Sequence, residues 1–157
     1  MKKQQKGFSL IELLIVVAII LIIAAIAIPN LLRARMAANE ASAVGGLRTI
    51  NTAEVTYFST YNVGFGTLAQ IGTPASGGCT ASSANACLID SVLTAGTKSG
   101  YTFAATPSGT GNSTYSSTAY AITQGQTGQR EFCSDQSAVI YFNATASACV
   151  QGTDSPI

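Results

Sequence analysis

The architecture of this chain depends on residues 2–30, KKQQKGFSLIELLIVVAIILIIAAIAIPN. A short basic and polar leader ends at Gly7, and the 21 residues of the range 8–28 include only two polar side chains, one of them Glu12. A helix of that length measures about 31 Å, at about 1.5 Å per residue, which is enough to cross the hydrocarbon core of a bilayer. The sequence therefore predicts a single membrane-spanning helix near the N-terminus.

Glu12 is the anomalous residue of this apolar run. A carboxylate inside a membrane span costs about 2.5–3.5 kcal/mol on insertion scales. A residue that costs so much is a candidate for function, and a positively charged partner is expected for it.

The basic leader fixes the expected orientation of the helix. Lys2, Lys3 and Lys6 precede the apolar run, and the positive-inside rule places such residues in the cytoplasm. The apolar run is longer than the 7–15 residues of an ordinary signal-peptide core, and no small-x-small cleavage site closes it. These features favour a membrane anchor over a secretory signal peptide.

Composition excludes several classes of function. The 157 residues carry a net charge of +1, only 10% are charged, and none is His. Without the three leader lysines the balance is five positive against seven negative side chains, or −2, which is unlike the basic footprint of a nucleic-acid binder. A Ser or Cys nucleophile would lack its usual base, and no nucleotide-binding or metal-binding motif is present. No catalytic, cofactor-binding or metal site is predicted, and Asp90, Asp135 and Asp154 are interpreted as solvated turn residues.

The four cysteines, Cys79, Cys87, Cys133 and Cys149, all follow the membrane segment. Four cysteines permit three pairings; we predict disulfides between sequence neighbours, Cys79–Cys87 and Cys133–Cys149. The second closes a loop of about 17 residues, worth about 3 kcal/mol in the chain-entropy model. The alternative, a zinc site, would need a CxxC pair or His. Disulfides indicate an exported, oxidising compartment.

After Asn30 the pattern predicts that the helix continues to about residue 60 as an amphipathic helix, about 80 Å long from residue 8. Its apolar half should protrude as a membrane anchor, and its second half should lie against a globular domain. Glu54 falls within the apolar stripe, a placement that the pattern does not explain; a satisfied interface carboxylate is favoured over a catalytic one. The stripe itself is expected to comprise Ala43, Leu47, Ile50, Tyr57 and Tyr61, widened by Val44, Val55 and Phe58.

The rest of the chain predicts a small antiparallel sheet. Residues 62–99 are rich in Gly, Ser and Thr and should form a long connecting loop, with a short helix over 86–94. From Gly100 onward, short β-type runs alternate with turn residues. An α+β fold is expected, in which a meander of about four strands buries one face on the helix. The expected strands span 101–105, 118–123, 131–133 and 138–143.

Residues 7–30, GFSLIELLIVVAIILIIAAIAIPN, resemble the N-terminus of type IV pilins and of the related pseudopilins of secretion systems. In that family a dedicated membrane peptidase cuts after the glycine and methylates the new N-terminal residue. The resemblance implies cleavage between Gly7 and Phe8, N-methylation of Phe8, an assembly role for Glu12 and a helix kink at Pro29. The resemblance also implies the pilin roll, an α+β fold. Beyond about residue 60 the resemblance lies in the order of the elements more than in any sequence motif.

The resemblance also implies a division of the chain. Residues 1–7 would be a cleaved leader, residues 8–30 a transmembrane and filament-core helix, and residues 31–157 a globular pilin domain that includes the second half of the helix. The Phe8 amine created by cleavage could pair with Glu12 of the same subunit or of a neighbour, and the family favours the neighbour.

The functional hypothesis is a structural subunit of a type IVa-like pilus, with roles in adhesion, twitching motility or DNA uptake implied by the family. The chain would lie in the inner membrane as a single-pass protein, in contact with lipid, and then join a homopolymer on the cell surface. Implied partners are the prepilin peptidase and an inner-membrane assembly platform with its ATPases. One alternative is a pseudopilin of a type II secretion system, disfavoured by four cysteines and few clustered acids. Another, a membrane-anchored periplasmic enzyme, is disfavoured by the absence of His. Major and minor pilins are not distinguished.

Overall fold

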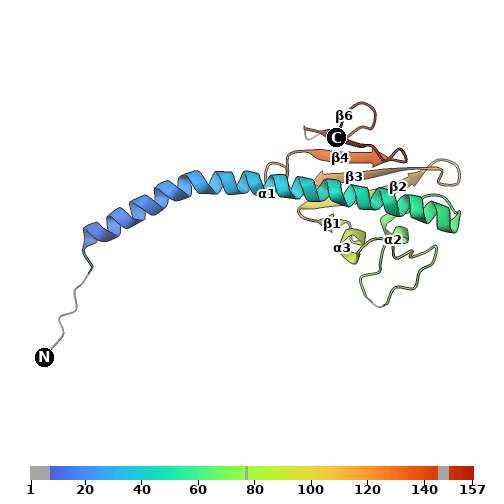
Figure 1. Ribbon diagram of the computed structural model, residues 1–157, viewed down its shortest axis with the longest axis horizontal. Coiled ribbons are helices and arrows are strands. Elements are labelled where there is room, and N and C mark those ends of the chain that lie inside the picture. Colours follow the sequence, from blue (N-terminus) through green and yellow to red (C-terminus); the bar gives the residue numbers. More distant parts are fainter. Residues whose placement is uncertain (1–7, 77, 145–148) are drawn as a thin grey trace. The chain divides into compact units, whose positions relative to one another are not determined.

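The computed structural model describes residues 8–76, 78–144 and 149–157. The predicted leader, residues 1–7, lies outside the described residues. The chain divides into two compact units, Met1–Arg35 and Met36–Ile157, and one helix, α1 (Leu10–Tyr61), runs through both (Figure 1). The long helix predicted for residues 8–60 is confirmed.

The second unit places α1 on one face of an antiparallel sheet (Figure 1). Each strand pairs with the strand that precedes it in sequence, so the described strands form a simple meander. The predicted α+β class is confirmed, with six strands in the described residues where about four were expected. The strands are β1 (Thr97–Lys98), β2 (Tyr101–Ser108), β3 (Thr114–Ala121), β4 (Glu131–Asp135), β5 (Ile140–Asn143) and β6 (Ser155–Pro156).

The strands that the sequence failed to predict, β1 and β6, have two residues each. A two-residue strand is too short to show the alternation by which strands are recognised. β2 and β3 are longer than predicted and pair from Tyr101↔Ala121 to Ser108↔Thr114. Pro107 is tolerated in β2 because β1 reaches only as far as Thr102, which leaves that edge of β2 without a ladder at the proline.

The described part of the connecting segment contains two short helices. α2 (Leu68–Ile71) was not predicted, and of the helix expected over residues 86–94 only α3 (Ser91–Thr94) forms. The residues before α3 pair with α2 instead, since the Ala86 N–H donates to the Gln70 carbonyl at 2.7 Å. A backbone pairing between distant segments leaves no local signature in the sequence.

The core lies between α1 and the sheet, and the predicted stripe supplies the helix side of it. Ala43, Leu47, Ile50 and Tyr57 are buried, and Tyr61 and Val44 pack against the cluster. On the sheet side, alternate residues of β2 point inward, including Tyr101 and Phe103. The prediction was wrong for Val55 and Phe58, which are 56% and 41% exposed. The helix therefore buries a narrower stripe on the sheet than the sequence pattern suggested.

Candidate assembly site

The first unit presents an apolar helical surface. The side chains of Phe8, Leu10 and Ile26 are 89%, 80% and 72% exposed, and the large apolar residues between them are exposed as well. In the described part of the chain, α1 is the one helix long and apolar enough to cross a membrane. This surface needs either lipid or other apolar helices to cover it.

Glu12 lies in the first turn of α1. The Ser9 N–H donates to Glu12 Oε2 at 3.0 Å, which places the carboxylate at the helix N-terminus, where the helix dipole favours negative charge. Ser-x-x-Glu is the capping-box pattern, in which the glutamate returns to the N-cap backbone. The structure thus gives Glu12 a local capping role that the sequence analysis missed, although the pattern Ser9-x-x-Glu12 was available as a signal.

The other predicted N-terminal sites are only partly described. Phe8 is the first described residue, whereas Gly7 lies outside the described residues, so cleavage between them and N-methylation of Phe8 stay predictions. Pro29 lies inside α1, which continues through it. A proline has no N–H, so the Ala25 carbonyl loses its helical donor; the kink stays a prediction.

A charged contact attaches the start of the second unit's helix to the β3–β4 connection. Glu40 Oε1 accepts from the N–H groups of Gln129 (2.9 Å) and Arg130 (3.2 Å), and Oε2 accepts from Arg130 Nε (2.8 Å). The Arg130 guanidinium also lies over the rings of Phe132 and Phe142, at 5.6 and 5.4 Å. Burial alone would raise the pKa of the Glu40 carboxyl, but these hydrogen bonds outweigh it and hold the pKa below its ordinary value.

A buried amide joins the middle of α1 to two strands. Asn51 Nδ2 donates to Ser134 Oγ on β4 at 2.7 Å. Asn51 Oδ1 accepts from the hydroxyls of Tyr115 (3.1 Å) and Ser117 (3.2 Å) on β3. The sequence analysis did not identify Asn51. Its spacing from Leu47, one helical turn earlier, was the signal that it faces the core.

Glu54 is the buried carboxyl that the sequence placed in the apolar stripe. Its side chain has no exposed surface. Oε2 accepts from the Gly66 N–H at 2.8 Å, so the expectation of a satisfied carboxylate holds for this oxygen and not for the other. Oε1 has no hydrogen-bond partner among the described residues. Burial raises the pKa of the Glu54 carboxyl to about 7, against the lowering effect of the Gly66 N–H.

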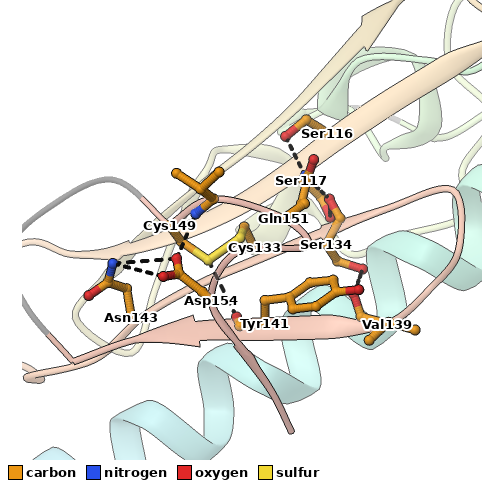
Figure 2. The surroundings of a disulfide bond; sticks show 11 residues. Ser116, Ser117, Cys133, Ser134, Val139, Tyr141, Asn143, Cys149, Gln151 and Asp154 are labelled. Atoms are coloured by element: carbon orange, nitrogen blue, oxygen red, sulfur yellow. Dashed lines mark hydrogen bonds between the residues drawn. A yellow bond between two sulfur atoms is a disulfide. The ribbon is translucent and has the colours of Figure 1, made fainter.

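The structure contains both disulfides that were predicted, Cys79–Cys87 and Cys133–Cys149. Figure 2 shows the second, which ties the C-terminal segment to β4. Beside it, Gln151 Nε2 donates to Ser116 Oγ (2.9 Å) and to the Ser134 carbonyl (2.8 Å) (Figure 2). The segment after Cys149 is therefore held to the sheet by a covalent bond and by polar contacts.

The scattered aspartates act as local hydrogen-bond acceptors. Asp90 caps α3 by accepting from the Leu93 N–H at 2.6 Å and pairs with Lys98 at 3.0 Å, which together lower its pKa. Asp135 accepts from the Ser137 N–H, and Asp154 accepts from the Val150 N–H. Within the described residues, no three His, Cys, Asp or Glu side chains are grouped as metal ligands would be.

Comparison with known proteins finds matches to an N-terminal motif and to type IV pilins. The family model for the prokaryotic N-terminal methylation motif matches residues 2–28. The chain is 46% identical over 56 residues to the type IV major pilin protein PilA of Myxococcus xanthus, an alignment that covers 36% of this chain and 26% of the relative. It is 66% identical over 38 residues to the type IV wide pilus major component PilA4 of Thermus thermophilus, which covers 24% of this chain and 29% of the relative.

These matches confirm the predicted resemblance to type IV pilins. The chain spans between a quarter and a third of the length of these curated relatives, 26% and 29%. No solved structure matches the chain.

Proposed function

We propose that this chain, which carries the prokaryotic N-terminal methylation motif and is similar to type IV pilins, is a structural subunit of a type IV pilus filament. The observation that carries the proposal is the combination of this motif with an exposed apolar helix that has one carboxylate at its start. Membrane lipid covers that helix in the single-pass precursor of the inner membrane. Other copies of the same helix cover it in the filament on the cell surface.

Assembly begins with processing. The prepilin peptidase cleaves between Gly7 and Phe8 and methylates the new amine of Phe8. That amine is a positive charge at the end of an apolar helix, and Glu12 lies one turn away. In the filament, Glu12 of one subunit pairs with the Phe8 amine of its neighbour, and Pro29 allows the helix to bend.

The charge pair sets the register between copies. A buried charge that loses its partner costs about 3–5 kcal/mol, so a helix that docks one turn too high or too low is strongly disfavoured. A contact that joins two different surfaces of the same chain, repeated without closing, generates a helical filament. The globular unit, fastened by its two disulfides, forms the outside of the fibre and performs no catalysis. An inner-membrane platform and its ATPases supply the energy.

Electron microscopy of material sheared from cells tests this proposal. Cells that express the chain should yield long filaments, a deletion strain should lack them, and the wild-type gene should restore them. If the deletion strain loses protein secretion but keeps its filaments, the proposal is contradicted, and the chain is instead a pseudopilin of a type II secretion system. Unchanged filaments and unchanged secretion would contradict both.

A further inference from the structure

The Glu54 carboxyl is an exception among the buried polar groups of the second unit. Its side chain is fully buried, with 0% of the residue exposed. Oε2 accepts one hydrogen bond, from the Gly66 N–H at 2.8 Å, and Oε1 has no partner among the described residues. The large majority of buried side-chain polar atoms in folded proteins are paired, so this half-satisfied carboxyl needs a physical account.

Among the residues that the structure describes, the groups that face Glu54 supply no positive charge to compensate it. Tyr57 lies one turn further along α1, and Tyr115 lies on β3. Burial raises the pKa of both hydroxyls most, and the nearby Glu54 charge raises it further. Tyr61 adds to this effect at Tyr57, and Asp135 adds to it at Tyr115. The segment before α2 contributes the Gly66 N–H. The ionised form of Glu54 is therefore the costly one, consistent with a carboxyl pKa raised by burial to about 7.

We propose that Glu54 is a proton-operated latch that holds residues 62–72 against α1. In its neutral form the carboxyl stays buried and keeps Gly66 in place. In its ionised form it carries a buried charge with a single N–H donor, and opening of the segment lets water solvate that charge.

The contacts of α2 determine how far the opening extends. Gly66 lies two residues before α2, next to its N-cap residue Thr67, and the Ala86 and Leu88 N–H groups donate to the carbonyls of Gln70 and Ile71. Release of α2 therefore also removes these two backbone attachments of the segment that contains the Cys79–Cys87 disulfide. The Tyr57 hydroxyl, which donates to the Ser83 carbonyl at 2.6 Å, keeps that segment attached at a second point. The latch thus couples external pH to the mobility of one surface of the globular unit.

Linkage sets the sign and size of the effect. Between the ordinary carboxyl pKa of 4.5 and the raised value of about 7, the closed state holds a proton that the open state releases. The opening equilibrium should therefore rise on the order of 100-fold from about pH 4.5 to about pH 7.5, and level off above pH 7.

Hydrogen exchange measured by mass spectrometry tests the latch on the full-length chain in detergent micelles. Rates for the amides of residues 66–72 are corrected for the intrinsic pH dependence of exchange. Wild-type protein should show the rise in opening, and the Glu54→Gln variant should not. Glu131→Gln is the matched control, because burial also raises the pKa of the Glu131 carboxyl on β4; this variant should behave as wild type. Amides of β3 provide the internal reference and should show no such rise.

Three results would overturn the latch: a pH dependence that persists in Glu54→Gln, one that disappears in Glu131→Gln, or one that is equally large at β3. Carboxyl carbon NMR of the wild-type chain gives a test that needs no variant to fold. The Glu54 carboxyl should titrate near pH 7, and titration near its ordinary value of 4.5 would refute the proposal.

Discussion

Two buried carboxyls on α1, Glu40 and Glu54, respond to their surroundings in opposite directions. Burial favours the neutral form of both. At Glu40 the hydrogen bonds from Gln129 and Arg130 outweigh burial and leave the pKa below the ordinary value of 4.5. At Glu54 the single hydrogen bond from the Gly66 N–H does not outweigh burial, and the pKa rises to about 7. Ionised Glu40 therefore stabilises the fold above pH 4.5, whereas ionisation of Glu54 makes the closed position of residues 62–72 progressively less stable between pH 4.5 and 7.

The Glu40→Gln variant tests the first half of this contrast. At about pH 7 we expect its free energy of unfolding to fall by about 2 kcal/mol, since hydrogen bonds to a charged acceptor are worth about 1.5–3 kcal/mol. As pH falls from 4.5 through the lower folded-state pKa, the wild type loses this contribution and the difference should shrink. Urea unfolding of the full chain in detergent, followed by near-ultraviolet circular dichroism, measures both values.

Asp135→Asn is the matched control for this experiment. The carboxylate of the half-buried Asp135, at the end of β4, accepts only the local Ser137 N–H among the hydrogen bonds of the described residues, so its replacement should change the free energy of unfolding by less than about 0.5 kcal/mol. An equal loss of stability in Glu40→Gln at neutral and acid pH would show that the Glu40 charge is not responsible.

The glycine pair in α1 shows how closely the helix approaches the sheet. A Cβ added at Gly46 would lie 2.7 Å from Phe103 Cε1 and 2.9 Å from Cζ, whereas one added at Gly45 would meet nothing within 4 Å. Both glycines weaken the helix by about 1 kcal/mol relative to alanine. Close packing against Phe103 therefore explains why position 46 is a glycine, whereas packing does not explain the glycine at position 45.

Alanine at each position gives a matched pair of variants. Gly45→Ala should raise the free energy of unfolding by about 0.5–1 kcal/mol, the gain in helix propensity. Gly46→Ala should lower it by about 1–3 kcal/mol, because the Phe103 ring must leave its place in a packed core. Thermal or urea unfolding of the full chain separates the two. The packing argument fails if Gly46→Ala is stabilised as much as Gly45→Ala.

The long elements of this chain could be predicted from sequence, and the short ones could not. α1 was recognisable from a run of 21 residues with only two polar side chains, followed by a helical stripe, and its buried face was correct at Leu47, Ile50 and Tyr57. β1, β6 and α2 have two to four residues, and their positions depend on pairing with distant segments. Pro107 illustrates the same point, because the paired length of β1 decides whether a proline fits in β2.

The candidate site divides in a similar way. Glu12 could be identified because a carboxylate is conspicuous in an apolar helix, and its capping bond to Ser9 follows from a local pattern. The roles of Asn51, Glu40 and Glu54 depend on residues more than ten positions away in the sequence, among them Ser134, Arg130 and Gly66. No local pattern reports such partners. Glu54 could be placed in the buried stripe but not given its partner.

For the filament as a whole, Glu12 variants separate capping from charge pairing. Gln retains an acceptor oxygen for the Ser9 N–H, as capping boxes allow, but has no charge for the Phe8 amine of a neighbour. Glu12→Gln should therefore be processed at Gly7 and retained in the membrane while it forms few or no filaments, and Glu12→Ala should do the same. Immunoblots of membranes and of sheared material measure processing and assembly separately. A filament yield from Glu12→Gln equal to that of wild type would exclude the charge pair.

The central claim is that this chain becomes a filament subunit after cleavage exposes Phe8. Mass spectrometry of the N-terminal peptide from filaments sheared off the cell surface tests it most directly. We predict that the filament contains this chain, that the peptide begins at Phe8, and that its amine carries one methyl group. Filaments that lack this chain, or that contain it with its N-terminus still at Met1, would contradict the account.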